Sequence, residues 1–399
     1  MDIISPKRSY LGVDLGTSAI KIVELQDKGG RALLLTYGYV EQPTDIIRSS
    51  SKEMEDKIVN IIKDICKKSR MSSKKVVAAL PSFSVFSSII NLPSMSKKDL
   101  AKAIQWEAKK FIPLPMEEMT LDWKVVPVRP DKKSVIPPIN NTNPNNKENA
   151  VSPNGEAGDA KQGSFLDKIF SHKGTVKGST PVNQLLKNNT KVLLTAAPKK
   201  IVERYIRIFR AAELELVSLE TESFALERSL AGNDPASIMI VDVGAVSSNI
   251  CIIESGIPVL TRSIDVGGTT LTKSIMSSLN VDLGRAEQFK RDIGFSSLGP
   301  GGLPDTIKTA INPIINEIKY SLDIYLAQNP TQNKVEKIIL TGGSSFLPEL
   351  PSFLSKILDI KVIIGDPWDK IVYPLELKPV LTEIGPRFSV AVGLAMREI

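Results

Sequence analysis

Two aspartates, Asp14 and Asp242, stand in the same local pattern in distant parts of the chain. Each ends an apolar run and is followed two positions later by a glycine, Gly16 or Gly244, then by a polar turn and a second apolar run. A glycine lets backbone N–H donors approach a phosphate closely. A carboxylate at a strand end can hold the water shell of Mg²⁺. The repeat therefore predicts two facing hairpins that hold the phosphates of a nucleotide.

The two turns also supply a positive charge and hydroxyl groups. Lys21 lies seven residues after Asp14 and could meet a β-phosphate as a point charge. Either turn alone is explained equally well as a simple strand turn, in which aspartate and glycine serve turn geometry. The duplication, with the same order of strand, turn and strand, favours the phosphate-binding interpretation.

A third segment, residues 337–354, reads as a buried strand, a Gly342-Gly343 turn and a helix that begins near Pro348. The two glycines would let an adenine or ribose lie against the backbone. A plain strand-to-helix turn also explains the glycines, but not the order of the three segments. The predicted nucleotide-binding residues are Gly12, Asp14, Gly16, Thr17, Ser18, Lys21, Asp242, Gly244, Ser247, Ser248, Asn249, Gly342, Gly343 and Ser344. The predicted magnesium ligands are Asp14 and Asp242.

The order of two phosphate motifs and one adenosine motif resembles the actin/Hsp70/sugar-kinase superfamily. Within it, the chain resembles the PilM family of type IV pilus assembly proteins, which is related to the division protein FtsA. The family-like segments are 104–118, 121–123 and 256–270. The resemblance implies an α/β, actin/Hsp70-like (ribonuclease H-like) fold of two duplicated domains, with the extra subdomain 1C of FtsA and PilM.

The expected division of the chain follows that fold. Subdomain 1A takes residues 9–82, 216–235 and 381–399, subdomain 1C takes 83–215, subdomain 2A takes 236–270 and 335–380, and the helical subdomain 2B takes 271–334. Within 1C, residues 130–190 are rich in Asn, Lys, Pro, Gly and Ser, and we predict that this insert is disordered. Its segment 164–170 has helical apolar spacing and could instead dock a partner.

Several local patterns predict individual elements. Ser96 is a plausible N-cap of the helix that ends before Pro113. A further helix is expected over residues 387–397. We expect the aromatic side chains of 1C, Trp106, Phe111 and Trp123, to serve core or inter-subdomain packing.

Hydrolysis of a nucleotide would need a group that positions water or takes its proton. By position, Glu222 and Glu220 are the candidates, although both could simply favour a helix N-terminus. The second turn reads Ala245-Val246 where the superfamily has glycines, so backbone approach to a γ-phosphate is expected to be looser. The resemblance thus implies bound ATP and Mg²⁺ with slow hydrolysis or none.

Composition excludes several other classes. The only histidine, His172, rules out a histidine-based triad, and Cys66 and Cys251 are expected to be reduced thiols. No apolar run approaches the ~20 residues that span a bilayer, and no secretory signal is recognisable at the start. The lysines are scattered despite a net charge of +7, so we expect no nucleic-acid partner and no direct membrane insertion.

The resemblance implies a cytoplasmic scaffold at the inner face of the cytoplasmic membrane. Its partners would be the N-terminal cytoplasmic tail of a PilN-like inner-membrane protein, held in a groove between 1A and 1C, and the assembly motor ATPase. A pilus and a related type II secretion platform remain open. The alternative is an FtsA-like cell-division ATPase, for which we expect a terminal amphipathic membrane helix that residues 396–399 do not provide. A sugar kinase or an Hsp70 chaperone would need segments that are not recognisable.

Overall fold

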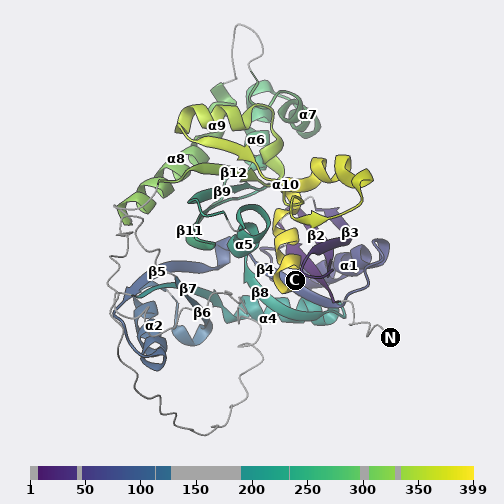
Figure 1. The fold of residues 1–399 in the computed structure, drawn as a ribbon. Helices are drawn as coiled ribbons and strands as arrows, with labels where there is room; N and C mark the ends of the chain where they lie inside the picture. The colour runs from purple at the N-terminus through teal and green to yellow at the C-terminus, as the bar shows by residue number, and fades with distance from the viewer. Residues whose placement is uncertain are drawn as a thin grey trace, which may run out of the picture.

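The computed structural model describes residues 8–42, 47–112, 114–126, 190–232, 234–296, 305–328 and 334–399. The predicted insert at residues 130–190, with its segment 164–170, lies outside the described residues apart from Thr190. Figure 1 shows three groups of strands, with the second domain at the top, the first at the lower right and subdomain 1C at the lower left.

The first sheet has six strands in the order β14-β3-β2-β1-β4-β8. Strand β1 is antiparallel to β2 and parallel to β4, and β4 is parallel to β8. The strands are β1 (Ser9–Leu15), β2 (Ala19–Asp27), β3 (Ala32–Glu41), β4 (Lys75–Leu80), β8 (Glu215–Thr221) and β14 (Ile371–Val372).

The second sheet repeats this arrangement in the order β11-β10-β9-β12-β13. Here β9 is antiparallel to β10 and parallel to β12, which is parallel to β13. The strands are β9 (Ile238–Val243), β10 (Ser248–Glu254), β11 (Ile257–Ile264), β12 (Lys337–Thr341) and β13 (Lys361–Ile364). The two sheets place β1 and β9 in equivalent positions, so the turns after them are equivalent too.

Subdomain 1C is a third sheet, with the order β5-β7-β6 and antiparallel pairs throughout. It consists of β5 (Phe86–Leu92), β6 (Met119–Val126) and β7 (Thr190–Pro198), covered by α2 (Lys97–Phe111). As predicted, Ser96 caps α2 and its hydroxyl accepts from the Asp99 N–H at 3.2 Å. The packing expectation is wrong for Trp106 and Phe111, which are 69% and 46% exposed, whereas Trp123 packs against the core of this subdomain.

Helices cover both faces of the first sheet. On one face α1 (Lys52–Lys68) and α4 (Lys199–Ala211) share an apolar core with β1, β2 and β4, and on the other lies α10 (Lys378–Ala395). Helix α10 begins nine residues before the expected start at Arg387, because it continues through Pro386.

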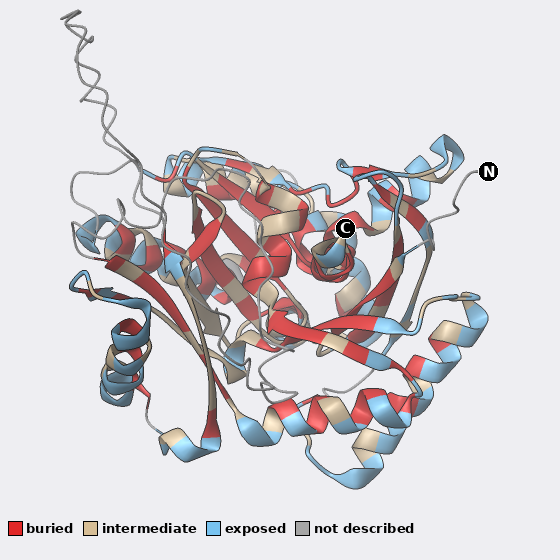
Figure 2. Cartoon of the chain, turned by 60° about the horizontal axis from the view of Figure 1, so that its bottom comes forward, coloured by how far each residue is buried: buried red, intermediate tan, exposed pale blue. Residues whose placement is uncertain are grey.

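The second sheet packs against α6 (Gly268–Leu279), α8 (Asp305–Gln328) and α9 (Leu350–Leu358), with α7 (Leu283–Ile293) beside α6. Between the two domains, α5 (Glu222–Leu226), its π-helical continuation η4 (Glu227–Ala231) and α10 join the sheets through a shared core. Figure 2 shows that buried residues are concentrated in the middle of the molecule, near the C-terminus. Strand β14 falls in the segment expected to belong to 2A, yet it pairs with β3 of the first domain.

Both cysteines are free thiols, with Cys251 buried. Among the residues that the structure describes, no helix combines the length and apolarity needed to cross a bilayer.

Candidate functional site

The turn between β1 and β2 carries an aspartate and a lysine that face each other. Asp14 and Lys21 are cross-strand partners, and the Lys21 ammonium donates to Asp14 Oδ2 at 2.8 Å. The turn closes with a hydrogen bond from the Gly16 N–H to the Ala19 carbonyl at 3.1 Å. The predicted neighbours Asp14, Gly16 and Lys21 therefore do come together at one strand end.

The turn between β9 and β10 has the same geometry. The Gly244 N–H donates to the Ser247 carbonyl at 3.0 Å, and Asp242 is the cross-strand partner of Asn249. Asn249 thus occupies in the second domain the position that Lys21 holds in the first. The hydroxyl of Ser248 donates to the Val266 carbonyl, so it is a structural group of the turn and not a free donor.

The third motif lies directly against the second turn. Gly342 has a φ of +83°, and a Cβ built on it would lie 2.3 Å from Asp242 Oδ1. Ser344 is buried beside Gly268, where an added Cβ would come within 2.6 Å of the Ser344 Oγ. The second turn and the third motif, which are far apart in the sequence, therefore lie together, and the charges of Lys21 and Asp14 act on Asp242 from the first turn.

Gly12 belongs to a different contact. A Cβ on this residue would meet the Ala391 carbonyl oxygen at 2.0 Å and the Ala395 nitrogen at 2.5 Å, both in α10. The glycine thus permits β1 and α10 to approach each other closely.

The start of α6 is a part of the site that the sequence analysis did not assign. The Gly268 N–H donates to the Gly244 carbonyl at 2.9 Å, and the Thr269 N–H donates to the Ala245 carbonyl at 2.8 Å. A Cβ on Gly267 would meet the backbone of Ala245 at 2.7 Å. The Gly-Gly-Thr-Thr run at a helix start was the available signal for this contact.

A polar cluster on α6 and α7 lies next to Gly268, the residue that is beside Ser344. The Lys290 ammonium donates to the Gly268 carbonyl, to Thr272 Oγ1 and to Glu287 Oε1, at 3.2, 2.7 and 2.7 Å. Burial lowers the pKa of Lys290, and its hydrogen bond to Glu287 works against that shift. No sequence pattern pointed to this cluster, because its members are brought together only by the packing of α6 on α7.

Glu222 is the first residue of α5 and lies near both hairpin turns, the one that follows β1 and the one that follows β9. Its Oε2 accepts hydrogen bonds from the hydroxyl and the N–H of Ser82 and from Asn249 Nδ2, the last at 2.9 Å. Burial, together with the charges of Asp14 and Asp242, raises its pKa to about 8. Burial also raises the pKa of Asp242 to about 6, with Lys21 opposing and Asp14 adding to the shift.

Glu220 is held elsewhere. It is buried and paired with the guanidinium groups of Arg228 and Arg397. These two ion pairs connect β8 to η4 and the end of the chain. The two glutamates that the sequence offered as equivalent candidates are therefore distinguished by position, and Glu222 alone adjoins Asp14 and Asp242.

The side chains of Asp14 and Asp242 share one ammonium group, Lys21, so this pair of carboxylates could accept additional positive charge. Within the described residues, no three acidic, cysteine or histidine side chains converge closely enough to coordinate a metal by themselves. A magnesium ion held by one or two carboxylates and by phosphate and water oxygens fits this donor set.

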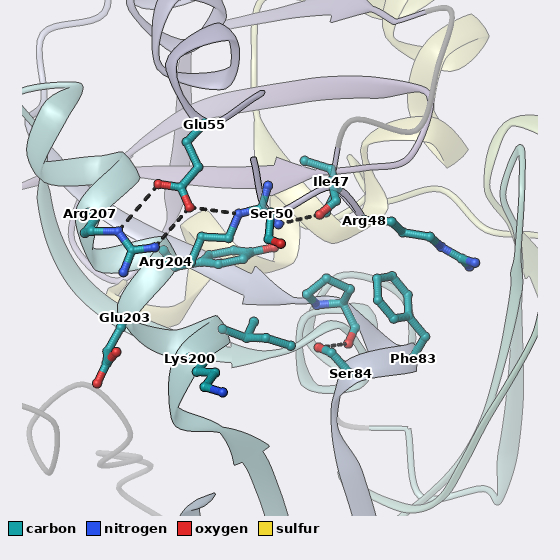
Figure 3. A pocket seen from close by; sticks show the side chains of 13 residues that line it. Ile47, Arg48, Ser50, Glu55, Phe83, Ser84, Lys200, Glu203, Arg204 and Arg207 are labelled. Atoms are coloured by element: carbon teal, nitrogen blue, oxygen red, sulfur yellow. Dashed lines mark hydrogen bonds and ion pairs between the residues drawn. The ribbon is translucent and has the colours of Figure 1, made fainter. Parts of the chain in front are cut away.

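A concavity, here called the groove, is formed by residues before and in α1, by the turn after β4 and by α4, where the chain passes between the first sheet and subdomain 1C. It has a volume of about 410 Å³. Its lining residues are Ile47, Arg48, Ser50, Glu55, Pro81, Phe83, Ser84, Lys200, Ile201, Glu203, Arg204, Tyr205 and Arg207. Figure 3 shows Glu55 between Arg204 and Arg207, with Phe83 and Ser84 on the opposite side.

Comparison with known proteins assigns the chain to a family. A family described as type IV pilus assembly protein PilM matches residues 12–137 and 181–399. The chain belongs to the PilM family. Among solved structures, a PilM-PilN type IV pilus biogenesis complex resembles it with a TM-score of 0.74 and 24% identity, over 98% of this chain and 99% of that one. The ethanolamine utilization protein EutJ of Carboxydothermus hydrogenoformans shares the fold with a TM-score of 0.51 and 14% identity, over 98% and 90%.

Division proteins are more distant relatives of this PilM-family chain. It is 21% identical to FtsA of Bacillus subtilis over 44% of each chain, and 26% identical to FtsA of Neisseria meningitidis over 39% of this chain and 41% of that protein. The match thus spans less than half the length of these relatives. The predicted actin-like, duplicated fold is confirmed, and the family match favours PilM over the FtsA alternative.

Proposed function

We propose that this protein is a scaffold of the type IV pilus assembly platform, or of a related type II secretion platform, at the inner face of the cytoplasmic membrane. It binds ATP with Mg²⁺ between its two domains and the N-terminal cytoplasmic tail of a PilN-like membrane protein in the groove. Family membership supports the pilus role. The main observation in support of the nucleotide site is the close approach of Gly342 to Asp242, which brings the third motif against the second turn.

Each part of the nucleotide has a matching set of groups in this proposal. Asp14 and Asp242 hold the hydrated magnesium ion, and Lys21 meets a phosphate. The backbone at Gly342, Gly343 and Ser344, with the Lys290 cluster beside it, takes the adenosine. The cation supplies charge stabilisation to the phosphates, and the protein residues position them.

Turnover is slow in this proposal because the second turn has Ala245 and Val246 where glycine would let the backbone approach a γ-phosphate more closely. Glu222, which lies beside Asp14 and Asp242, is the candidate group that positions water. The protein therefore acts as a nucleotide-responsive binding module.

The groove is the proposed tail site because it lies at the 1A–1C junction and has both apolar and charged walls. An extended peptide can place its side chains in such pockets while its backbone bonds to the protein. The assembly motor ATPase stays a predicted partner with no surface assigned to it.

Calorimetric titration of ATP and ADP with Mg²⁺ tests the nucleotide site, with Gly342→Ala as the decisive variant. A methyl group at residue 342 must displace Asp242 Oδ1, so we expect the affinity to fall by at least about tenfold. Gly29→Ala is the matched control, since Gly29 also has a positive φ, +65°, but an added Cβ meets nothing within 4 Å. Equal affinities of the Gly342→Ala and wild-type proteins would contradict this assignment of the site.

A further inference from the structure

One side of α2 in subdomain 1C carries four lysines and an exposed tryptophan, and is here called the α2 face. Its residues are Lys98, Lys102, Trp106, Lys109 and Lys110. Each is three or four positions from another member, the spacing that places side chains on the same side of a helix. Lysines that look scattered along the sequence are therefore gathered on one surface by the fold.

The opposite side of α2 holds the helix in place. Leu100, Ile104 and Ala108 are buried there in the core of subdomain 1C. The α2 face therefore points outward, and Figure 1 shows the helix at the lower edge of this subdomain.

All five side chains of the α2 face are exposed, and their charges are largely unpaired. Of the four lysines, only Lys110 has an acidic partner among the described residues, Glu107 at 2.8 Å. The Lys110 ammonium also lies 5.3 Å from the centre of the Trp106 ring. The indole is nevertheless 69% exposed, which leaves a large apolar surface in contact with water.

A bilayer with anionic headgroups matches both kinds of side chain. A lysine near such a surface strengthens binding by about fivefold, and its long apolar stem lets the ammonium reach the phosphates. Tryptophan favours the boundary between headgroups and hydrocarbon, because its ring is apolar and its N–H is polar. The α2 face presents the two together on a single helix.

Two other occupants fit the α2 face less well. A second copy of the chain that docked through the same face would bring two sets of four lysines together, and like charges repel. A peptide is bound best where its side chains enter pockets, and the groove, which provides such a cavity, contains no residue of α2.

We propose that the α2 face binds the anionic headgroups of the cytoplasmic membrane, with Trp106 at the headgroup level and the helix outside the hydrocarbon core. This goes beyond the proposed scaffold role, which attaches the protein to the membrane only through the tail of its partner. Two attachments that form together strengthen each other, because the first raises the local concentration for the second.

Sedimentation of the full-length protein with lipid vesicles at low salt tests the proposal. We expect binding to vesicles of equal parts phosphatidylglycerol and phosphatidylcholine, and none to vesicles of phosphatidylcholine alone. Added salt should weaken the binding, because it screens the lysines. Lys102→Glu combined with Lys109→Glu should lower the affinity by at least about 25-fold, fivefold for each lysine lost. The matched control is Lys356→Glu combined with Lys361→Glu, an equal change of net charge at two exposed lysines in α9 and β13 of the second domain.

Trp106→Ala tests the apolar part of the α2 face. We expect the vesicle affinity to fall about tenfold while the free energy of unfolding stays unchanged, since the ring is mostly exposed. Tyr320→Ala, at an exposed aromatic residue of α8, should keep the vesicle affinity of the wild-type protein.

Wild-type protein that remains in solution with the anionic vesicles overturns the proposal, and so does an equal loss of affinity in the two charge variants. Binding to a fluorescent single-stranded oligonucleotide in place of the vesicles would make the α2 face a nucleic-acid site. The vesicles contain no peptide and no nucleotide, so a failure here leaves the proposed tail and ATP sites as they stand, and their failure leaves lipid binding as it stands.

Discussion

The chemistry of the candidate site at the two turns depends on a few carboxyl side chains of similar type in different surroundings. Asp14 has a direct partner in Lys21, whereas Glu222 is held by neutral donors from Ser82 and Asn249. Burial beside other carboxylates therefore favours the protonated form of Glu222, and its pKa rises to about 8. The difference could not be read from the sequence, because it depends on which strand ends meet across the two domains.

Glu222→Gln tests this charge state through the pH dependence of stability. Between the ordinary pKa of 4.5 and about 8, the folded protein binds more protons at this site than the unfolded chain does. The free energy of unfolding therefore falls as pH rises through that window, and the variant should lack this part of the fall. We expect urea unfolding to show a difference of about 2 kcal/mol between the two proteins in the change from pH 5 to pH 7. Glu383→Gln, at an exposed glutamate, should keep the wild-type slope, and a Glu222→Gln slope equal to it would refute the raised pKa.

At the scale of elements, the sequence predicted what local patterns control. Apolar runs and Asp-x-Gly turns predicted both hairpins, and the capping residue Ser96 predicted the start of α2. It did not predict that α10 runs through Pro386, whose carbonyl accepts hydrogen bonds from the Gly342 N–H and Thr341 Oγ1. Nor did it predict the packing role of Gly12, since both features depend on contacts between residues far apart in the chain.

Gly393→Ala tests how closely α10 packs against α5. A Cβ at this position would lie 1.9 Å from the Ala225 carbonyl oxygen and 2.5 Å from its carbon, and backbone atoms cannot yield as a flexible side chain can. We expect the free energy of unfolding to drop by about 3 kcal/mol, as for an overpacked core. The control is Gly284→Ala in α7, where the nearest atom is the end of a side chain at 3.3 Å, and the change should stay within about 1 kcal/mol. Similar stabilities of the two variants, measured by chemical unfolding, would contradict the close approach of α10 to α5.

At the scale of the whole molecule, one short turn touches both proposed binding sites. In the 3-10 turn η1 (Ser82–Ser84), Ser82 donates to Glu222 while Phe83 and Ser84 line the groove. The guanidinium of Arg48 lies 4.7 Å from the centre of the Phe83 ring and also pairs with Asp265 of the second domain. A change in this turn therefore affects both Glu222 and the contact between the domains.

We expect the nucleotide and the tail peptide to strengthen each other's binding, because both favour the arrangement in which η1 is fixed. A peptide packed on Phe83 immobilises the turn, and this keeps Ser82 on Glu222 beside the phosphates. A coupling of about fivefold corresponds to about 1 kcal/mol and must be the same in both directions. Peptide titrations with and without ATP and Mg²⁺ measure it, and Ser82→Ala should bring the ratio of the two affinities close to one. A wild-type ratio of one, with both ligands bound, would show that the turn does not connect the sites.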